Sequence, residues 1–223
     1  MIEDQVRDFY GKLRFPGTYT LNNLEFFDFY EGNKFLKPYI KAARTSRNVL
    51  DIGCGTGFIT NLLARKFIHL EIDAVDFCDS IDIAQTFSKT HGIKNVRYFK
   101  ENFLDFVPDK SYDLIISNGV LHHMPEYKKA IEKIKSYNPN LLVLGIYNKY
   151  GKLFKSVSPV NYRSDILYQD QELVPFELSF THDEFVSFFK DYKLLHPHFL
   201  VDIKNLFNRK NGGLTIYTFA KPV

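Results

Sequence analysis

The sequence predicts an α/β protein with a doubly wound, mostly parallel seven-stranded sheet, an antiparallel closing strand and helices on both faces. From residue 48 to residue 147, short apolar runs alternate with amphipathic stretches at helical spacing. Such runs are typical of parallel strands that helices cover on both faces. Beyond residue 190, two more apolar runs are joined by the turn residues NRKNGG, which predicts an antiparallel pair at the end of the sheet.

The first part of the pattern contains five expected strands and three expected helices. The strands cover residues 48–52, 72–76, 95–99, 112–117 and 141–147. The helices cover residues 57–67, 79–92 and 125–137. Sheets of this kind bind ligands at the carboxyl ends of their strands, so the site is expected at that edge.

Helix ends can be read from single residues. Asp79 or Ser80 can cap the second helix, and Gly92 is placed to end it. Pro125 suits the first turn of the third helix. The residues Thr-His-Asp-Glu from Thr181 onward form a capping box, which predicts a further helix with phenylalanines facing inward.

We expect a single domain over residues 1–223, made of four parts. These are an N-terminal cap or lid (1–45), a binding core (46–147), an insertion over the site (148–178) and a closing helix with a strand pair (179–223). Ten of the first 40 residues are Phe or Tyr. This density predicts a helical cap on the core, which can also line an apolar pocket.

Composition limits the classes of function. The net charge of +3 and pI of about 8.6 are too weakly basic to indicate a nucleic-acid surface. Cys54 and Cys78 lack the spacing of a disulfide framework, and the N-terminus lacks the pattern of a signal peptide. There is no apolar run of membrane-spanning length and no His/Cys/Asp/Glu cluster with metal-ligand spacing. We therefore expect a cytoplasmic protein without a metal; its oligomeric state stays open.

The stretch VLDIGCGTG, residues 49–57, joins the first strand to the first helix of the core. Gly53, Gly55 and Gly57 allow a tight turn and let a ligand approach the backbone. The spacing is G-x-G-x-G, whereas nicotinamide dinucleotide sites use G-x-G-x-x-G. Asp76 ends the second strand, where a carboxylate can accept hydrogen bonds from a ribose. Asn102 and Asn118 follow the third and fourth strands.

Together, VLDIGCGTG, AVD, FKENFLDF and YDLIISNGVLHH resemble the class I S-adenosylmethionine-dependent methyltransferases from about residue 47 to 147. The resemblance implies S-adenosylmethionine as cofactor and S-adenosylhomocysteine as product. It implies cofactor contacts at Asp51, Gly53, Cys54, Gly55, Gly57, Asp76, Phe77, Asn102, Phe103, Asn118 and Val120. Asn102 replaces the family's usual aspartate, and Tyr137-Asn138-Pro139-Asn140 replaces its Pro-Gly-Gly turn.

Methyl transfer from a sulfonium mainly requires that the nucleophile is held close to the methyl group. A base is needed only where the acceptor must lose a proton. His122 and His123 are the candidate bases, or else form a wall of the site. The candidate substrate contacts are Tyr10, Tyr19, Tyr30 and Tyr147.

The acceptor is expected to be a small, partly apolar molecule. The residues Ser117-Asn118-Gly119-Val120 replace the Pro-Pro-aromatic motif of nucleic-acid amino-methyltransferases, and no cysteine is placed for cytosine C5 chemistry. A protein or RNA acceptor and a catalytically silent cofactor-binding subunit stay as alternatives. A nicotinamide oxidoreductase is disfavoured by the loop spacing.

Overall fold

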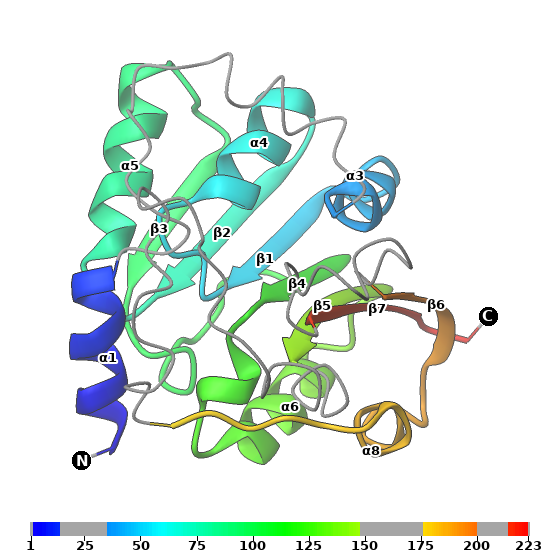
Figure 1. The fold of residues 1–223 in the computed structure, drawn as a ribbon. Coiled ribbons are helices and arrows are strands. Elements are labelled where there is room, and N and C mark those ends of the chain that lie inside the picture. The colour runs from blue at the N-terminus through cyan, green and yellow to red at the C-terminus, as the bar shows by residue number, and fades with distance from the viewer. Residues whose placement is uncertain (1, 14–34, 148–175, 200–213, 223) are drawn as a thin grey trace, which may run out of the picture.

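A computed structural model of the chain describes residues 2–13, 35–147, 176–199 and 214–222. Its centre is a seven-stranded sheet in the order β3-β2-β1-β4-β5-β7-β6 (Figure 1). The strands are β1 (Asn48–Ile52), β2 (Glu71–Asp76), β3 (Val96–Lys100), β4 (Leu114–Asn118), β5 (Leu141–Tyr147), β6 (Lys193–Phe199) and β7 (Leu214–Ala220). The first five are parallel, and β7 is antiparallel to both β5 and β6. The predicted fold class is therefore confirmed.

Helices cover both faces of this sheet. The described helices are α1 (Ile2–Leu13), α3 (Lys37–Ala43), α4 (Phe58–Lys66), α5 (Ser80–Thr90), the short 3₁₀ helix η1 (Leu121–His123), α6 (Tyr127–Ser136) and α8 (His182–Ser187). Figure 1 shows α3, α4 and α5 on one side of the sheet and α6 and α8 on the other. None of the described helices is long and apolar enough to cross a membrane.

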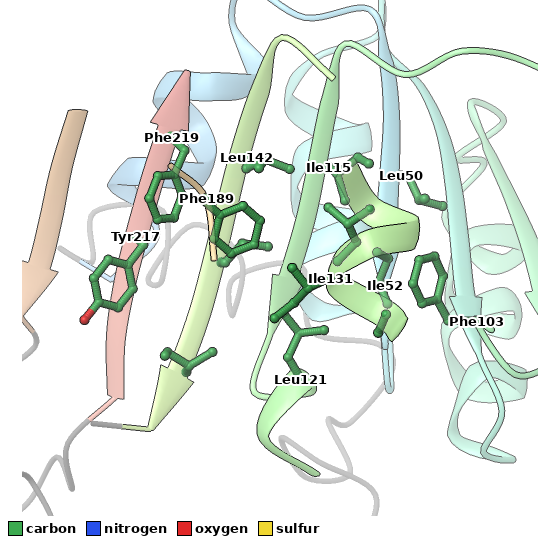
Figure 2. Packing of buried hydrophobic residues seen from close by; sticks show 14 of the residues in the cluster. Leu50, Ile52, Phe103, Ile115, Leu121, Ile131, Leu142, Phe189, Tyr217 and Phe219 are labelled. Carbon is green, nitrogen blue, oxygen red and sulfur yellow. The ribbon is translucent and has the colours of Figure 1, made fainter. Parts of the chain in front are cut away.

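Alternate residues of the central strands supply two separate cores. Leu114 and Ile116 of β4 pack toward α3 and α4, whereas Ile115 between them packs toward α6. Figure 2 shows the second core, where Leu142 of β5 and Phe219 of β7 lie among the buried residues. Burial on both faces explains why these strands are apolar throughout.

The expected helix ends are partly correct. Thr181 forms the predicted capping box with Glu184, and Gly92 has a positive φ of 65° just after α5. Asp79 occupies the N-cap position of α5, but its carboxylate pairs with Lys100 at 2.9 Å and does not cap the helix. Helix α6 begins at Tyr127, so the expectation that Pro125 lies in its first turn was wrong.

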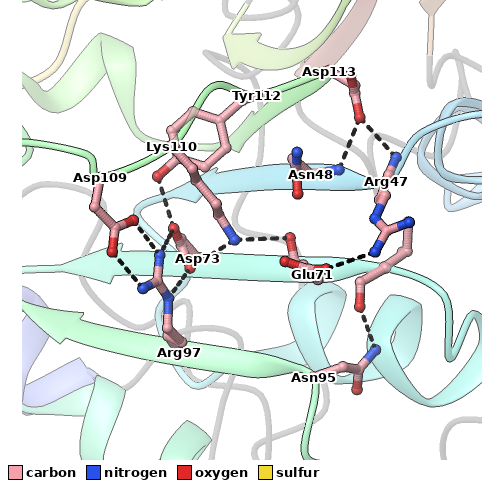
Figure 3. A network of polar contacts seen from close by, with 11 residues as sticks. Arg47, Asn48, Glu71, Asp73, Asn95, Arg97, Asp109, Lys110, Tyr112 and Asp113 are labelled. Atoms are coloured by element: carbon pink, nitrogen blue, oxygen red, sulfur yellow. Dashed lines mark hydrogen bonds and ion pairs between the residues drawn. The ribbon is translucent and has the colours of Figure 1, made fainter.

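A polar network connects residues at or near the amino ends of β1, β2, β3 and β4 (Figure 3). Asp73 of β2 is fully buried and accepts two hydrogen bonds from Arg97, at 2.8 and 2.7 Å, and one from the Tyr112 hydroxyl at 2.8 Å. Arg97 also makes two bonds of 2.7 Å to Asp109. A buried carboxylate is tolerated here because its oxygens are paired with donors on neighbouring segments.

Candidate functional site

Three glycines form the turn between β1 and α4. Gly53, Gly55 and Gly57 have φ angles of 71°, 55° and 79°. Side chains disfavour this left-handed region, so the path of the turn itself requires glycine. The N–H of Gly53 donates to the carbonyl of Val75 over 2.8 Å, which holds the turn against the end of β2.

The loop after β4 lies directly on this turn. A Cβ built at Gly53 would lie 2.2 Å from Val120 Cγ2, well inside van der Waals contact. A Cβ at Gly57 would instead meet the Cβ of Ala84 in α5 at 2.5 Å. Gly53 therefore allows Val120 to approach the predicted cofactor turn, whereas Gly57 allows α4 to pack on α5.

Two buried carboxylates flank the turn. Asp51 is 4% exposed and accepts a hydrogen bond from the Thr60 hydroxyl. Burial raises the pKa of Asp51 from 3.8 to about 7, the Thr60 hydrogen bond lowers it, and the charge of Asp76 raises it. Burial also raises the pKa of Asp76, although its oxygens accept from the N–H groups of Gly55 (2.7 Å) and Cys78 (2.8 Å).

The charge at this edge indicates what kind of ligand fits. Burial raises the pKa values of Asp51 and Asp76, and hydrogen bonds from neutral donors lower them. The charge of Asp76 also raises the pKa of Asp51. Buried carboxylates with raised pKa values favour a ligand whose hydroxyls and positive charge stabilise their ionised form, and they disfavour a phosphate. An amino-acid-tailed nucleoside with a sulfonium meets these conditions, and a pyrophosphate directly beside Asp51 does not.

The expected adenine contacts, Asn102 and Phe103, follow β3. Asn102 uses its side-chain oxygen to accept from the N–H of Leu104 at 2.9 Å, so a ligand would meet its amide nitrogen. Phe103 is 5% exposed as a residue, and its side chain belongs to the core beneath α6. Only its backbone is therefore suited to ligand contact, as the resemblance implies. Phe77 is partly exposed beside Asp76.

The cysteines have no accessible thiol chemistry in this fold. Cys54 and Cys78 are free and buried. Burial raises the pKa of both thiols above the ordinary value, and the charge of Asp76 adds to the effect. Cys54 therefore stabilises the turn through its backbone N–H, which donates to the carbonyl of Val75 over 3.3 Å.

Asn118 is fixed by two residues that the sequence did not indicate. The hydroxyl of Tyr39, in α3, donates to Asn118 Oδ1 over 2.9 Å. Gly145 of β5 makes room for that amide, because a Cβ there would lie 2.3 Å from the same oxygen. The side chain of Asn118 is thus turned toward α3, which leaves its backbone at the end of β4 to meet a ligand.

The candidate catalytic histidines lie in η1, just after β4. His123 Nε2 is 2.7 Å from the Tyr10 hydroxyl, and His123 Nδ1 is 3.0 Å from the carbonyl of Phe176. His122 is fully buried, with its ring centroid 4.2 Å from that of Tyr147. The structure thus brings Tyr10 and Tyr147 together with both histidines, and adds Phe176. Tyr19 and Tyr30 lie outside the described residues.

Helix α1 covers this edge of the sheet. Its Arg7 carbonyl accepts from Cys78 Sγ at 3.6 Å, after β2, and its Tyr10 reaches His123, after β4. Figure 1 shows α1 on the side toward which the arrow of β1 points. Helix α1, a described part of the expected N-terminal cap, thus lies at the carboxyl ends of these strands. The proposed insertion at 148–178 is described only from Phe176 onward.

Comparisons with known proteins agree with this geometry. Residues 44–148 match a family model described as a methyltransferase domain. The malonyl-[acyl-carrier protein] O-methyltransferase of Bacillus anthracis is 33% identical over 94 residues, which cover 42% of this chain and 34% of that protein. The aligned stretch thus spans about a third of the length of this curated relative.

Solved structures share the fold at low sequence identity. Magnesium protoporphyrin IX methyltransferase from Synechocystis PCC 6803, with S-adenosylmethionine bound, has a TM-score of 0.68 at 13% identity and covers 100% of this chain and 98% of that chain. The N-methyltransferase NodS from Bradyrhizobium japonicum WM9, with S-adenosylhomocysteine, has a TM-score of 0.63 at 13% identity and covers 99% and 100%. Over residues 44–148 the chain is thus similar to methyltransferase domains, and its fold is similar to that of methyltransferases solved with S-adenosylmethionine or S-adenosylhomocysteine bound.

Proposed function

We propose that this chain transfers the methyl group of S-adenosylmethionine to an O or N atom of a small, partly apolar molecule by in-line displacement. S-adenosylhomocysteine would leave as the product. The observation that carries this proposal is the positive-φ glycine turn between two buried carboxylates, Asp51 and Asp76.

Different residues at and near the turn would bind different parts of the cofactor. Asp76 would accept hydrogen bonds from the ribose hydroxyls, and Asp51 with the backbone at Gly53 would hold the amino-acid tail. The amide of Asn102 and the backbone of Phe103 would hold the adenine. When bound, the sulfonium supplies an already activated methyl group, so the chain's remaining task is to position the acceptor and exclude water.

An acceptor of limited size is supported by the residues around η1. The rings of Tyr10, His122, His123 and Tyr147 contact one another at η1, which directly follows Val120, and both histidines are buried. Aromatic rings with a few polar atoms are typical of the walls of small-molecule sites. The names of the similar proteins include both O- and N-methyltransferases, which supports either atom as the nucleophile.

Calorimetry with S-adenosylhomocysteine tests the cofactor half of the proposal. We expect saturable binding to the wild type and at least a tenfold loss in Asp76→Ala, because one charged hydrogen-bonding group is worth roughly 1.5–3 kcal/mol. Asp109→Ala is the matched control, since that exposed carboxylate belongs to the distant network of Figure 3. Equal affinity in all three proteins would contradict the proposal.

The acceptor class requires a turnover experiment. S-adenosylmethionine with a labelled methyl group is incubated with the protein and a cell extract, divided into small-molecule and macromolecular fractions. We expect label to appear in small molecules. Label confined to protein or RNA would favour a macromolecular acceptor, and binding without any transfer would favour a catalytically silent subunit.

A further inference from the structure

We propose that Thr60 of α4 is a positioning residue for the cofactor, because its hydroxyl holds one oxygen of Asp51 and directs the other toward the amino group of the amino-acid tail. This inference rests on the proposed function and deepens it. It concerns a threonine that lies in the helix beyond the glycine turn, outside the motif VLDIGCGTG. The hydrogen bond from Thr60 to Asp51 and the burial of both residues carry it.

The hydroxyl of Thr60 points away from the backbone of its own helix. Helical threonines commonly donate to the carbonyl four residues earlier, as Thr86 and Thr90 of α5 do at 2.7 and 2.9 Å. The hydroxyl of Thr60 donates instead to Oδ2 of Asp51, which lies in the neighbouring strand β1. Both residues are buried, so water competes little for this bond. Thr60 therefore connects the two elements that the glycine turn joins.

The two ends of this hydrogen bond belong to segments that are themselves held in place. The backbone of Asp51 lies within β1, which pairs with β2 on one side and with β4 on the other. Helix α4 is held at its start, because the N–H of Asn61 donates to the carbonyl of Gly57 at 2.8 Å. A bond between two such segments fixes the rotation of the carboxylate. It thereby fixes the direction of Oδ1, the oxygen that Thr60 does not hold.

Thr60 also acts on the charge of Asp51. Burial raises the pKa of Asp51 to about 7, and the hydrogen bond from Thr60 lowers it, because a donor stabilises the ionised carboxylate. At neutral pH the Thr60 hydroxyl thus increases the fraction of Asp51 that is ionised. The amino group of an amino-acid tail is positively charged at this pH, so it binds the ionised form more strongly than the neutral form.

Other titratable groups around Asp51 leave it in a negative environment. Among the described residues, those whose charges interact with it are Asp76 of β2, Cys54 of the turn, Tyr39 of α3 and Tyr98 of β3. Burial raises the pKa of the thiol and of both hydroxyls above their ordinary values, so these three groups stay neutral near pH 7. Asp76 adds negative charge and raises the pKa of Asp51. A positively charged ligand group would therefore stabilise both carboxylates.

Two ligands separate the positioning of Asp51 from general support of the turn. S-adenosylhomocysteine carries the amino-acid tail, whereas 5′-methylthioadenosine has the same nucleoside without it. We expect Thr60→Val to lower the affinity for S-adenosylhomocysteine roughly tenfold at pH 7, because a hydrogen bond to a charged group is lost. The affinity for 5′-methylthioadenosine should stay unchanged, and Thr60→Ser, which keeps the hydroxyl, should bind both ligands as the wild type does. Equal losses for both ligands in Thr60→Val, or no loss for either, would overturn the inference.

Ser88→Ala is the matched control, because it also removes a buried hydroxyl that bonds to α4. The Ser88 hydroxyl donates to Oδ1 of Asn61, the residue after Thr60, and this bond does not involve Asp51. We expect Ser88→Ala to bind both ligands as the wild type does. A selective loss of S-adenosylhomocysteine affinity as large as that of Thr60→Val would show that any buried hydroxyl at α4 has this effect, which contradicts the inference.

The pH profile of binding gives a result that a purely structural role would not change. In the wild type, calorimetry should show an affinity for S-adenosylhomocysteine that rises with pH and levels off near 7, above which Asp51 is ionised before the ligand binds. Loss of the Thr60 hydroxyl raises the pKa of Asp51, so the profile of Thr60→Val should move upward by roughly one pH unit. Asp76 and the ligand's amino group are the same in both proteins, so the difference reports Asp51. An unchanged profile would exclude the role of Thr60.

Thermal melts at pH 5 and pH 8 give a readout without ligand. The folded pKa of Asp51 lies above its unfolded value, so its ionisation costs stability as pH rises, and the cost is larger without the Thr60 hydroxyl. Relative to the wild type, Thr60→Val should therefore lose more stability at pH 8 than at pH 5, whereas Ser88→Ala should lose the same at both. Equal losses in Thr60→Val at the two pH values would show that the hydroxyl does not act on the ionised carboxylate.

Failure of this inference and failure of the proposed function give different results. If the wild type does not bind S-adenosylhomocysteine, the proposed function fails and the role of Thr60 fails with it. If the wild type binds it and Asp76→Ala weakens that binding, the cofactor half of the proposed function stands. An unchanged ratio of the two ligand affinities in Thr60→Val, with an unchanged pH profile, then excludes the role of Thr60 alone.

Discussion

Val120 packs over Gly53 so closely that a Cβ on the glycine would lie 2.2 Å from a methyl carbon of the valine. This contact joins the loop after β1, which is the predicted cofactor turn, to the loop after β4, which leads into the candidate acceptor wall at η1. Glycine is needed at position 53 for two reasons. Its φ is positive, at 71°, and Val120 occupies the space that a Cβ would take.

Gly53→Ala is expected to destabilise the protein by about 2–4 kcal/mol, because it combines backbone strain with overpacking. Adding Val120→Ala should recover the overpacking part and leave the strain. Gly92→Ala isolates strain alone, since Gly92 has a φ of 65° with no heavy atom within 4 Å of an added Cβ. Chemical denaturation measures all three, and a Gly53→Ala cost no larger than that of Gly92→Ala would contradict the account.

Asp51→Asn is expected to stabilise the fold above pH 7 while weakening cofactor binding. Folding raises the pKa of Asp51 from 3.8 to about 7, so the folded state binds the proton more tightly than the unfolded state. The free energy of unfolding should fall as pH rises from about 4 to 7 and then level off. The neutral amide removes this penalty, which is on the order of 4 kcal/mol at pH 8.

Thermal melts of wild type and Asp51→Asn at pH 5 and pH 8 measure the effect. The variant should gain stability over the wild type mainly at pH 8, while calorimetry shows weaker binding of S-adenosylhomocysteine. A variant that melts lower than the wild type at pH 8 would show that the ionised carboxylate stabilises the fold.

Tyr39→Phe should cost about 1 kcal/mol of stability, because Asn118 Oδ1 loses its donor. Affinity for S-adenosylhomocysteine should also fall, since the backbone at the end of β4 loses an anchor. Tyr137→Phe is the matched variant, because that hydroxyl donates to the Phe106 carbonyl at 3.2 Å, in the core away from the turn. Equal losses of affinity in both variants would exclude a specific role for Tyr39.

Asp73→Ala should destabilise the protein by about 3 kcal/mol without changing cofactor affinity. The substitution leaves the hydroxyl of Tyr112 without its acceptor and removes two hydrogen bonds from Arg97. Asp109→Ala, which removes an exposed partner of Arg97, should cost less than about 1 kcal/mol. A loss of affinity in Asp73→Ala at temperatures where it is folded would show that this network reaches the site.

The central strands and the glycine turn could be predicted because their signals are local. Strand residues buried on both faces must be apolar, and a turn through positive φ must be glycine. The capping box of Thr181 needs only four consecutive residues. Asp79 shows the limit even here, since its N-cap position was predictable but its pairing with Lys100, from β3, was not.

The contacts that complete the site join residues far apart in the chain. Tyr10 meets His123 across 113 positions, and Tyr39 meets Asn118 across 79. No spacing pattern in one sequence indicates such pairs. Phe176 contributes a backbone carbonyl, which any residue type supplies, so its side chain carried no signal. The conformation of the turn was therefore predictable, whereas the contacts around η1 required the fold.

The central claim is that the turn at Gly53, with Asp51 and Asp76, binds an amino-acid-tailed nucleoside. A crystal structure with S-adenosylhomocysteine bound tests it most directly. The account predicts ribose hydroxyls on the Asp76 carboxylate, the amino-acid tail along Gly53, and the sulfur facing the side of Val120 where Tyr10 meets His123. Binding that leaves Asp76 without a ribose contact, or a ligand placed away from the turn, would contradict it.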